Sequence, residues 1–326
     1  MAVRAGQLAY EVIQGWDRLP EGWSYVEVGG VATDSRDRVY VFNRGQHPVI
    51  VFDRDGRFLT AWGEGVFTNP HGITIGPDDA VYCVDNFDHT VRKFTTEGVP
   101  LLTLGTKDRP SDTGYTRESP KVLRAAGPFN RPTNLALSPA GEMYVADGYG
   151  NARVHKFSAA GKHLFSWGEP GSGPGQLNLP HGIVIDRRGT VYVADRENSR
   201  IQLFTPDGEY LAEWRDVNRP CDLYIDRDEH MYVAELGFRA GIAAGAPVPE
   251  GHTPLARVSV FTLDGRLRAR WGGAESCAPG NFFAPHGIWA DSHGDIYVGE
   301  VIASAGGRRG LVPLDCHALQ KFARKR

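Results

Sequence analysis

One phrase recurs along the chain at nearly regular intervals and constrains the fold more than any other feature. In its clearest form it is Pro-His-Gly-Ile, followed by a β-branched and aromatic run that ends on an acidic residue fourteen positions after the histidine. The three clearest copies pair His71 with Asp85, His181 with Asp195, and His286 with Glu300. A repeated unit of this kind determines the architecture, so it has to be identified before single elements are assigned.

The same fourteen-residue offset identifies three further copies that lack the histidine. They pair Gly29 with Asn43, Thr133 with Asp147, and Cys221 with Glu235. Each of the six copies predicts several short strands, because apolar runs rich in β-branched and aromatic residues alternate with turns rich in Gly, Pro and Asp. Four strands in about 40 to 50 residues are typical of a propeller blade. The sequence therefore predicts an all-β protein, a six-bladed β-propeller.

The sixth copy has room for only three strands before the chain ends. Residues 8–16 resemble the other fourth strands, so we expect this N-terminal segment to complete the last blade and remove its open edge. The prediction is a single domain over residues 1–326; the alternative, a two-sheet β-sandwich, does not account for the repeat. Three insertions interrupt the period, at residues 106–128, 238–255 and 302–316, and such loops are either functional or disordered.

Composition argues against several classes of function. A formal net charge of −3 over 326 residues gives no electrostatic reason to expect nucleic acid or an anionic membrane as a partner. The first residues lack the apolar segment of a signal peptide, and no run approaches the about 18 apolar residues of a membrane span. The cysteines show no paired spacing, so we expect no disulfide framework and a cytoplasmic location. They are Cys83, Cys221, Cys277 and Cys316.

The histidines of the repeat fall in alternate copies. His71, His181 and His286 open the first strands of copies two, four and six, and the first strand of each blade lines the channel of a propeller. Alternate blades of a six-fold ring are about 120° apart, so three side chains at equal height converge on the axis. Three imidazoles with one open side are a ligand set of catalytic zinc, and iron or manganese also accept imidazole. A single histidine would more often be a structural residue, but three in alternation favour a metal site.

The positions at and after the acidic residue are a second set of candidates. We interpret the acids themselves, such as Asp85 and Asp195, as structural residues that bond backbone between blades. Arg44 and Arg196 follow this position in copies one and four, where a planar guanidinium suits a substrate carboxylate. The alternative for either arginine alone is a surface salt bridge.

Several phrases together resemble those of the NHL-repeat family, and more narrowly of the peptidyl-α-hydroxyglycine α-amidating lyases. The resemblance covers most of the chain, from Val28 to Phe322. A general NHL protein would share the strand pattern but not the histidines, the Arg44 phrase and the Tyr149 phrase together. The phrases are FNRGQH at 42–47, NPHG at 69–72, FNRPT at 129–133, DGYGNAR at 147–153, LPH at 179–181, DRENSRIQ at 195–202 and PH at 285–286.

The resemblance implies a zinc-dependent lyase that splits an N-acyl-α-hydroxyglycine into a primary amide and glyoxylate. It implies that His71, His181 and His286 hold the zinc. It also implies that Tyr149 removes the hydroxyl proton, and that the family's two active-site arginines are Arg44, beside that phenol, and Arg196, on the substrate carboxylate. We therefore expect a small-molecule or short-peptide substrate that carries a carboxylate.

The chain also departs from the lyase pattern. The family's disulfides have no counterpart at the matching phrases, and its calcium-binding Asp directly after the third histidine is Gly287 here, so we do not expect that ligand for a structural calcium. Two other functions stay open: a metal-dependent hydrolase such as a lactonase on the same ring, and a non-enzymatic NHL scaffold. Three histidines argue against calcium lactonases, which use oxygen ligands. The sequence does not determine the oligomeric state.

Overall fold

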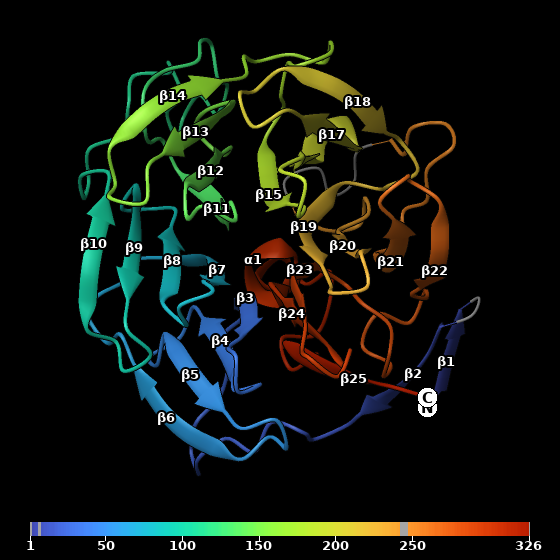
Figure 1. Cartoon of the computed structure of the whole chain (residues 1–326). Coiled ribbons are helices and arrows are strands. Elements are labelled where there is room, and N and C mark those ends of the chain that lie inside the picture. Colours follow the sequence, from blue (N-terminus) through green and yellow to red (C-terminus); the bar gives the residue numbers. More distant parts are fainter. Residues whose placement is uncertain (1, 6–7, 242–246, 326) are drawn as a thin grey trace. The chain divides into compact units, whose positions relative to one another are not determined.

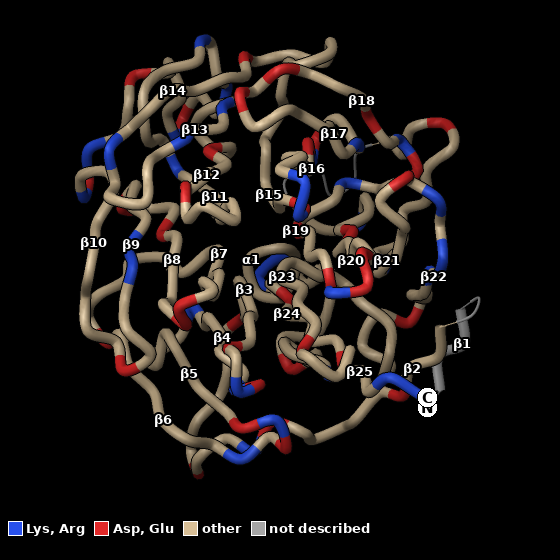
Figure 2. The backbone as a smooth tube through the Cα atoms, viewed as in Figure 1, with Lys and Arg blue, Asp and Glu red and all other residues tan. Residues whose placement is uncertain are grey.

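The computed structural model describes residues 2–5, 8–241 and 247–325 (Figure 1). These residues form six sheets of antiparallel strands, and the fold is the predicted six-bladed β-propeller. Acidic and basic residues are interspersed along the described chain (Figure 2). The one α-helix in this part of the chain, α1 (Ile302–Ala305), has four residues, so no described helix is long enough to cross a membrane.

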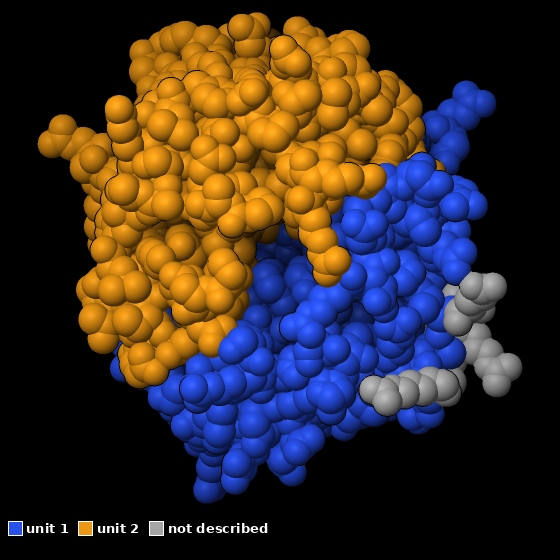
Figure 3. Space-filling model, in the orientation of Figure 1, with its two compact units in different colours: residues 1–64, 218–326 blue, residues 65–217 orange. Residues whose placement is uncertain are grey.

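The sheets divide between two compact units (Figure 3). Unit 1 comprises residues 1–64 and 218–326, and unit 2 comprises residues 65–217. Each unit contains three of the six sheets, which we call blades and number by the order of their first strands. That residues 1–326 form one domain stays a prediction.

Unit 2 holds blades 2, 3 and 4, each a sheet of four consecutive strands. Blade 2 consists of β7 (Pro70–Ile75), β8 (Val81–Asp85), β9 (Thr90–Phe94) and β10 (Pro100–Leu104). Blade 3 consists of β11 (Pro132–Leu137), β12 (Met143–Asp147), β13 (Arg153–Phe157) and β14 (His163–Trp167). Blade 4 consists of β15 (Pro180–Ile185), β16 (Val191–Asp195), the 3-10 turn η1 (Arg196–Asn198), β17 (Arg200–Phe204) and β18 (Tyr210–Trp214).

Unit 1 holds blades 1, 5 and 6. Blade 1 consists of β3 (Val28–Thr33), β4 (Val39–Asn43), β5 (Val49–Phe52) and β6 (Phe58–Trp62), and blade 5 of β19 (Pro220–Ile225), β20 (His230–Glu235), β21 (Arg257–Thr262) and β22 (Leu267–Trp271). Blade 6 has the order β1 (Ala2–Ala5), β2 (Leu8–Ile13), β25 (Leu319–Arg324), β24 (Ile296–Glu300) and β23 (Pro285–Ala290). The 3-10 turn η2 (Gly307–Arg309) follows α1.

The N-terminal segment completes blade 6, as predicted. Strand β2 pairs antiparallel with β25, from Tyr10 opposite Arg324 to Ile13 opposite Lys321. The predicted strand ended at Trp16; the observed strand ends at Ile13, and Trp16 packs against the ring of Phe52 instead. Strand β1 adds a fifth strand that the sequence analysis did not predict.

An acidic residue or asparagine at the end of each second strand binds the backbone at the entry to the same blade. In every blade its side-chain oxygen accepts an N–H from the residue seventeen positions earlier, at 2.5 to 3.1 Å. Asp195, for example, accepts from Asn178 at 2.6 Å. The structural role was predicted correctly, but the predicted bond between blades was wrong, because this bond joins the residue two positions before the first strand to the end of the second strand of the same blade.

Cys277 and Cys316 form a disulfide within unit 1, which contradicts the expectation that the cysteines form no disulfide framework. The two residues are 39 positions apart. Cys277 lies in the segment before β23 and Cys316 in the insertion at 302–316, so the spacing of the cysteines in the sequence does not predict the disulfide. The expectation of a cytoplasmic location rested partly on an absence of disulfides and loses that support, since disulfides persist mainly in oxidising compartments. Cys83 and Cys221 are buried and take no part in this disulfide.

The three insertions differ in their structure. The insertion at 302–316 contains α1 and η2, and Ile302, Ala305 and Val312 pack in a buried apolar cluster of unit 1. Part of the insertion at 238–255 lies outside the described residues. The insertion at 106–128 has no helix or strand in its course, and its Thr113 is fully buried and donates to Gly150 O at 2.5 Å.

Candidate active site

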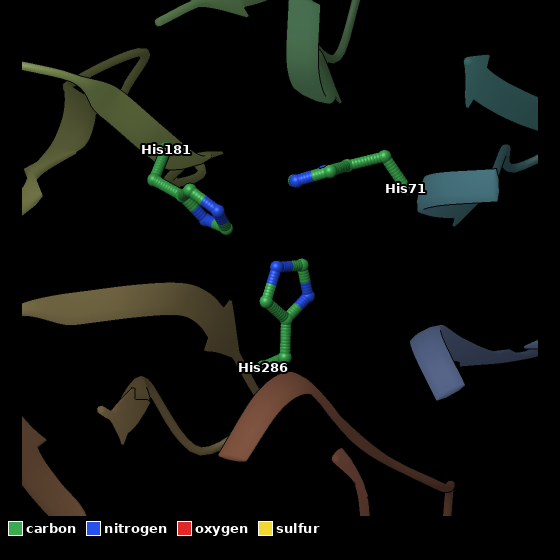
Figure 4. Close-up of side chains that lie close together, drawn as sticks. All are labelled: His71, His181 and His286. Atoms are coloured by element: carbon green, nitrogen blue, oxygen red, sulfur yellow. The ribbon is translucent and has the colours of Figure 1, made fainter. Parts of the chain in front are cut away.

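Unit 2 brings His71 and His181 together. Both side chains are buried, their ring centroids lie 4.8 Å apart, and a ligating nitrogen of each lies within 4.8 Å of the other (Figure 4). Each histidine is the second residue of its blade's first strand, β7 or β15, where the pairing register with the second strand shifts. An irregularity of this kind re-aims a side chain relative to a regular strand. The local break in register therefore directs both imidazoles out of their own sheets.

Hydrogen bonding fixes the ring of His71. Its Nδ1 lies 2.6 Å from the carbonyl oxygen of Thr133 on β11 of the next blade. A carbonyl oxygen only accepts, so Nδ1 carries the proton and the neutral ring presents the lone pair of Nε2. Metal-ligating histidines commonly donate their second ring nitrogen to such an oxygen. His71 is thus oriented as an Nε2 ligand.

His286 has the same arrangement in unit 1. It is the second residue of β23, it is buried, and its Nδ1 lies 2.7 Å from the carbonyl oxygen of Gly29 on β3. Gly29 and Thr133 occupy the repeat position of the histidines in the blades that lack one. Blades 1 and 3 therefore supply the backbone acceptors that orient the imidazoles of His286 and His71.

Tyr149 contacts both histidines of unit 2. Its ring centroid lies 5.3 Å from that of His71 and 5.6 Å from that of His181, and its hydroxyl oxygen is 3.3 Å from His181 Nε2. Arg196 Nη1 donates to the same hydroxyl oxygen at 3.2 Å, and its guanidinium carbon lies 5.2 Å from the Tyr149 ring centroid. A phenol oxygen between an imidazole nitrogen and a guanidinium can exchange a proton and hold the negative charge that results.

Arg44 lies in unit 1 and pairs with a buried acid. Its Nη1 donates to Glu27 Oε1 at 2.9 Å, and its backbone N–H donates to the Glu27 carbonyl. Glu27 Oε2 also accepts the backbone N–H of Ser304 at 2.7 Å, which attaches α1 to the same acid. In unit 2, the arginine that contacts the Tyr149 hydroxyl is Arg196, for which the resemblance implied the substrate carboxylate instead. The function of Arg44 stays a prediction.

Arg131 is a residue of this site that the sequence analysis missed. Its guanidinium carbon lies 5.1 Å from the ring centroid of Tyr149 and 4.8 Å from that of Phe87. Its Nη1 donates to the hydroxyl of Tyr115, which belongs to the insertion at 106–128. The sequence feature that could have pointed to Arg131 is its place two residues before the repeat position of Thr133. Its contact with Tyr115 could not be deduced in this way, because Tyr115 lies outside the repeat.

Gly287 is closely packed. A Cβ atom at this position would lie 2.6 Å from the Cα of Gly30, so any side chain here requires the β3 backbone to move. The close approach of β23 to β3 gives a packing reason for the glycine where the family carries an acidic residue.

Comparison with known proteins connects these features to a family. The sequence profile of the NHL repeat matches residues 177–204, which contain β15, β16 and β17. Over 263 residues the chain is 34% identical to human NHL repeat-containing protein 3, which covers 75% of this chain and 72% of that protein. It is 28% identical over 324 residues to peptidyl-alpha-hydroxyglycine alpha-amidating lyase 2 of Drosophila melanogaster. That match covers 87% of this chain and 72% of the relative. Mouse peptidyl-glycine alpha-amidating monooxygenase is 33% identical over 310 residues, covering 84% of this chain but 29% of that longer protein.

Solved structures share the fold at low identity. A streptogramin B lyase superposes with a TM-score of 0.61 at 13% identity, over 99% of this chain and 100% of its own. A gluconolactonase from Xanthomonas campestris gives a TM-score of 0.61 at 13% identity, with both chains fully covered. At this identity the likeness concerns the fold alone, and one fold serves a lyase and a lactonase.

Proposed function

This chain belongs to the NHL-repeat family, and from that premise we propose that it is a metal-dependent lyase that cleaves a carbon–nitrogen bond at a hydroxylated carbon. The proposed substrate is an N-acyl-α-hydroxyglycine, and the products are an amide and glyoxylate. One observation carries the proposal: the Tyr149 hydroxyl lies 3.3 Å from His181 Nε2 and 3.2 Å from Arg196 Nη1. Relatives named as amidating lyases support the same reaction class.

We propose that His71, His181 and His286 together bind one zinc ion. The donor chemistry fits, because His71 and His286 are buried and have their Nδ1 atoms on backbone carbonyls, so both present Nε2. A bound zinc ion supplies a Lewis acid for a substrate oxygen. Three neutral imidazoles also suit iron or manganese, which the metal analysis below distinguishes.

The protein residues move the proton. Tyr149, as phenolate, takes the proton of the substrate hydroxyl while Arg196 holds the phenol oxygen through its hydrogen bond. The carbinol C–O bond becomes the C=O bond of glyoxylate, and the C–N bond breaks with its electron pair going to nitrogen. The nitrogen then takes the proton from Tyr149, which gives the primary amide and restores the phenolate.

Two other functions make different predictions. A lactonase on the same scaffold would use water as nucleophile and would not need Tyr149 beside two histidines, and the likeness to the gluconolactonase extends to the fold alone. A non-enzymatic scaffold would have no need for buried histidines oriented as ligands. The arrangement of Tyr149, His71 and His181 therefore favours the lyase.

Metal content and glyoxylate release test the proposal. The wild type and His181→Ala are purified without added metal, analysed by elemental mass spectrometry and assayed with α-hydroxyhippurate. We expect about one zinc per chain in the wild type and at least about ten-fold less metal and glyoxylate in the variant, since losing one of three ligands weakens the site severely. His163→Ala, an exposed histidine of β14, serves as the control that keeps both.

The outcomes separate the three functions. A folded wild type without metal would contradict the zinc site and favour a scaffold. Metal bound through His181 without glyoxylate release would contradict the lyase and favour the hydrolase.

A further inference from the structure

The guanidinium of Arg131 is surrounded by aromatic rings. Its carbon lies 4.8 Å from the ring centroid of Phe87, 5.1 Å from that of Tyr149 and 5.6 Å from that of Tyr115. The side chain is partly buried, and its Nη1 donates to the Tyr115 hydroxyl. Aromatic faces stabilise a cation but do not neutralise it.

Within the described part of the chain, Arg131 has no carboxylate partner. Its Nε is buried and makes no hydrogen bond there. The two arginines predicted from the sequence differ in this respect, because Arg44 pairs with Glu27 and Arg196 pairs with Glu197, each at 2.9 Å. A guanidinium that is partly removed from water without a counter-charge carries a desolvation cost that a bound anion offsets.

The backbone holds Arg131 in place beside Tyr149. Its φ of +62° is in the left-handed region, its N–H donates to His89 Nδ1 at 3.0 Å, and its carbonyl accepts from Tyr149 N–H at 3.3 Å. These bonds fix the distance between the Arg131 and Tyr149 backbones. The Arg131 guanidinium therefore lies beside the Tyr149 ring.

Blade 5 shows what an arginine at this repeat position does when it is structural. Arg219 also lies two residues before the repeat position and has a positive φ of 48°. Its Nη1 donates to the carbonyl oxygens of Gly237 at 2.9 Å and Ala240 at 2.8 Å, so the blade's own backbone satisfies it. Arg219 also lies over one ring, that of Phe238 at 5.8 Å, but its Nη1 donates to two carbonyls, whereas Nη1 of Arg131 donates to a phenol hydroxyl.

We propose that Arg131 binds the carboxylate of the substrate and makes the enzyme specific for α-hydroxy acids over neutral carbinolamides. The proposal rests on the proposed function, in which Tyr149 takes the proton of the substrate hydroxyl. In an α-hydroxyglycine the hydroxyl and the carboxylate are bonded to the same carbon, so the group that binds the carboxylate must lie next to the base. A planar guanidinium binds a carboxylate through two parallel hydrogen bonds.

Kinetics with a charged and a neutral substrate test the proposal. Wild type, Arg131→Met and Arg131→Lys are assayed with α-hydroxyhippurate and with its neutral carboxamide. Arg131→Met should raise KM for the carboxylate substrate about 10- to 100-fold, the range for losing hydrogen bonds to a charged group, and leave the neutral substrate within about three-fold. Arg131→Lys keeps the positive charge but not the planar pair of hydrogen-bond donors, so its KM for the carboxylate substrate should lie between those of the wild type and Arg131→Met.

Binding of an unreactive carboxylate tests the same residue without turnover. Calorimetry with hippurate, which lacks the hydroxyl, should give a Kd about ten-fold or more weaker for Arg131→Met than for wild type. Arg117→Met is the matched control, because Arg117 is an exposed arginine of the insertion at 106–128 and also lies over Phe87, at 5.1 Å. It should bind hippurate like the wild type, and circular dichroism establishes that each variant folds.

The outcomes distinguish the inference from the proposed function. If the wild type releases no glyoxylate but binds hippurate, and Arg131→Met weakens that binding, the lyase proposal is contradicted. The carboxylate site at Arg131 is then still supported. Equal losses for the charged and neutral ligands would assign Arg131 a packing role beside Tyr149 and overturn the proposal. Hippurate that binds Arg131→Met as well as wild type, or does not bind wild type at all, would also overturn it; Arg131→Lys replaces the Met variant if that one does not fold.

Discussion

A backbone carbonyl determines which nitrogen His71 and His286 can offer to a metal. Thr133 O and Gly29 O accept from Nδ1, so each ring presents Nε2. The sequence predicted where these histidines lie, because their position in the repeat is regular. It could not predict their acceptors, which come from the neighbouring blade and depend on how two blades pack. The positions of these two histidines therefore follow from the repeat, whereas the orientation of their rings depends on tertiary contacts.

Tyr149 is the residue whose removal tests the chemistry most directly. We expect Tyr149→Phe to keep its metal and to lose glyoxylate release by about 100- to 10,000-fold, the contribution of a positioned general base. The ring still packs against His71 and His181, since only the hydroxyl is removed. Elemental analysis and initial rates measure the two quantities, and a variant with wild-type rates would remove Tyr149 from the mechanism.

Asp195 holds the entry of blade 4 together. Its buried carboxylate accepts from Asn178 N–H at 2.6 Å and from the buried Arg200 Nε at 2.7 Å. Asp195→Ala removes one of the two acids that pair with Arg200 and leaves Glu213 at 2.8 Å, so we expect the free energy of unfolding in urea to fall by about 2 to 3 kcal/mol. Asp207→Ala, at an exposed turn of the same blade, should change it by less than about 1 kcal/mol, and equal effects would contradict the role of Asp195.

Arg131 escaped prediction for a physical reason. Its aromatic neighbour Tyr115 belongs to the insertion at 106–128, and an insertion has no register from which a contact can be deduced. Arg196 could be proposed from the sequence because it follows the repeated acid, but its hydrogen bond to the Tyr149 hydroxyl was not predicted. Regular positions could be predicted from the sequence, and contacts between the repeat and its insertions could not.

At the scale of elements, the segments outside the repeat are attached to it by specific bonds. The insertion at 302–316 is joined to the segment before β23 by the Cys277–Cys316 disulfide and to blade 1 by the bond from Ser304 N–H to Glu27. Next to the disulfide, His317 Nε2 lies 3.0 Å from Glu300 Oε1, the repeated acid of blade 6. The sequence predicted the strands on either side of this segment but none of its tethers.

His317 should make the stability of this region depend on pH. Burial lowers the pKa of His317, but the hydrogen bond and charge of Glu300 raise it more, so the pKa lies above its usual value. The folded chain therefore binds this proton more tightly than the unfolded chain. The resulting stabilisation is fully present below the unfolded pKa of about 6.5 and is lost as the pH rises through the raised pKa.

We expect His317→Gln to lower the urea midpoint clearly at pH 6 and less at pH 9, because the wild type itself loses the ion pair at high pH. Urea unfolding followed by fluorescence at both values measures the difference. His293→Gln, an exposed histidine of blade 6, is the control. An equal loss at both pH values would show that His317 acts through packing and not through its charge.

At the scale of the whole molecule, the repeat was sufficient to predict the architecture. Six copies with one fixed offset predicted six blades, and the missing strand of the last copy predicted the pairing of β2 with β25. The fifth strand β1 and the disulfide Cys277–Cys316 were not predicted, because neither belongs to the repeated unit. The repeat therefore predicts the strands that all blades share, and it does not predict a strand or disulfide that occurs in one blade alone.

The closing strand should be essential for a soluble protein. Tyr10 and Val12 of β2 are buried in an apolar cluster with Trp271 and Phe322, and β2 covers the edge of β25. Removing residues 1–16 exposes that cluster and an unpaired strand edge, so we expect most of the product to aggregate. Soluble yield and size-exclusion chromatography measure this, with removal of residues 1–5 as the control. A monomeric, soluble product of the longer deletion would contradict the role of β2.

The pairing of β2 with β25 also sets the order of events during synthesis. The two partners are separated by roughly 300 residues, so at about 5 to 20 residues per second the ribosome needs about 15 to 60 s to release the second after the first. For that interval the edge of β2 that pairs with β25 has no partner strand, although β1 already lies on its other edge, and blade 6 cannot form before β25 has been synthesised. The molecule is therefore most exposed to aggregation while it is still being made, and its yield should depend on chaperones that bind an emerging strand and on the speed of translation.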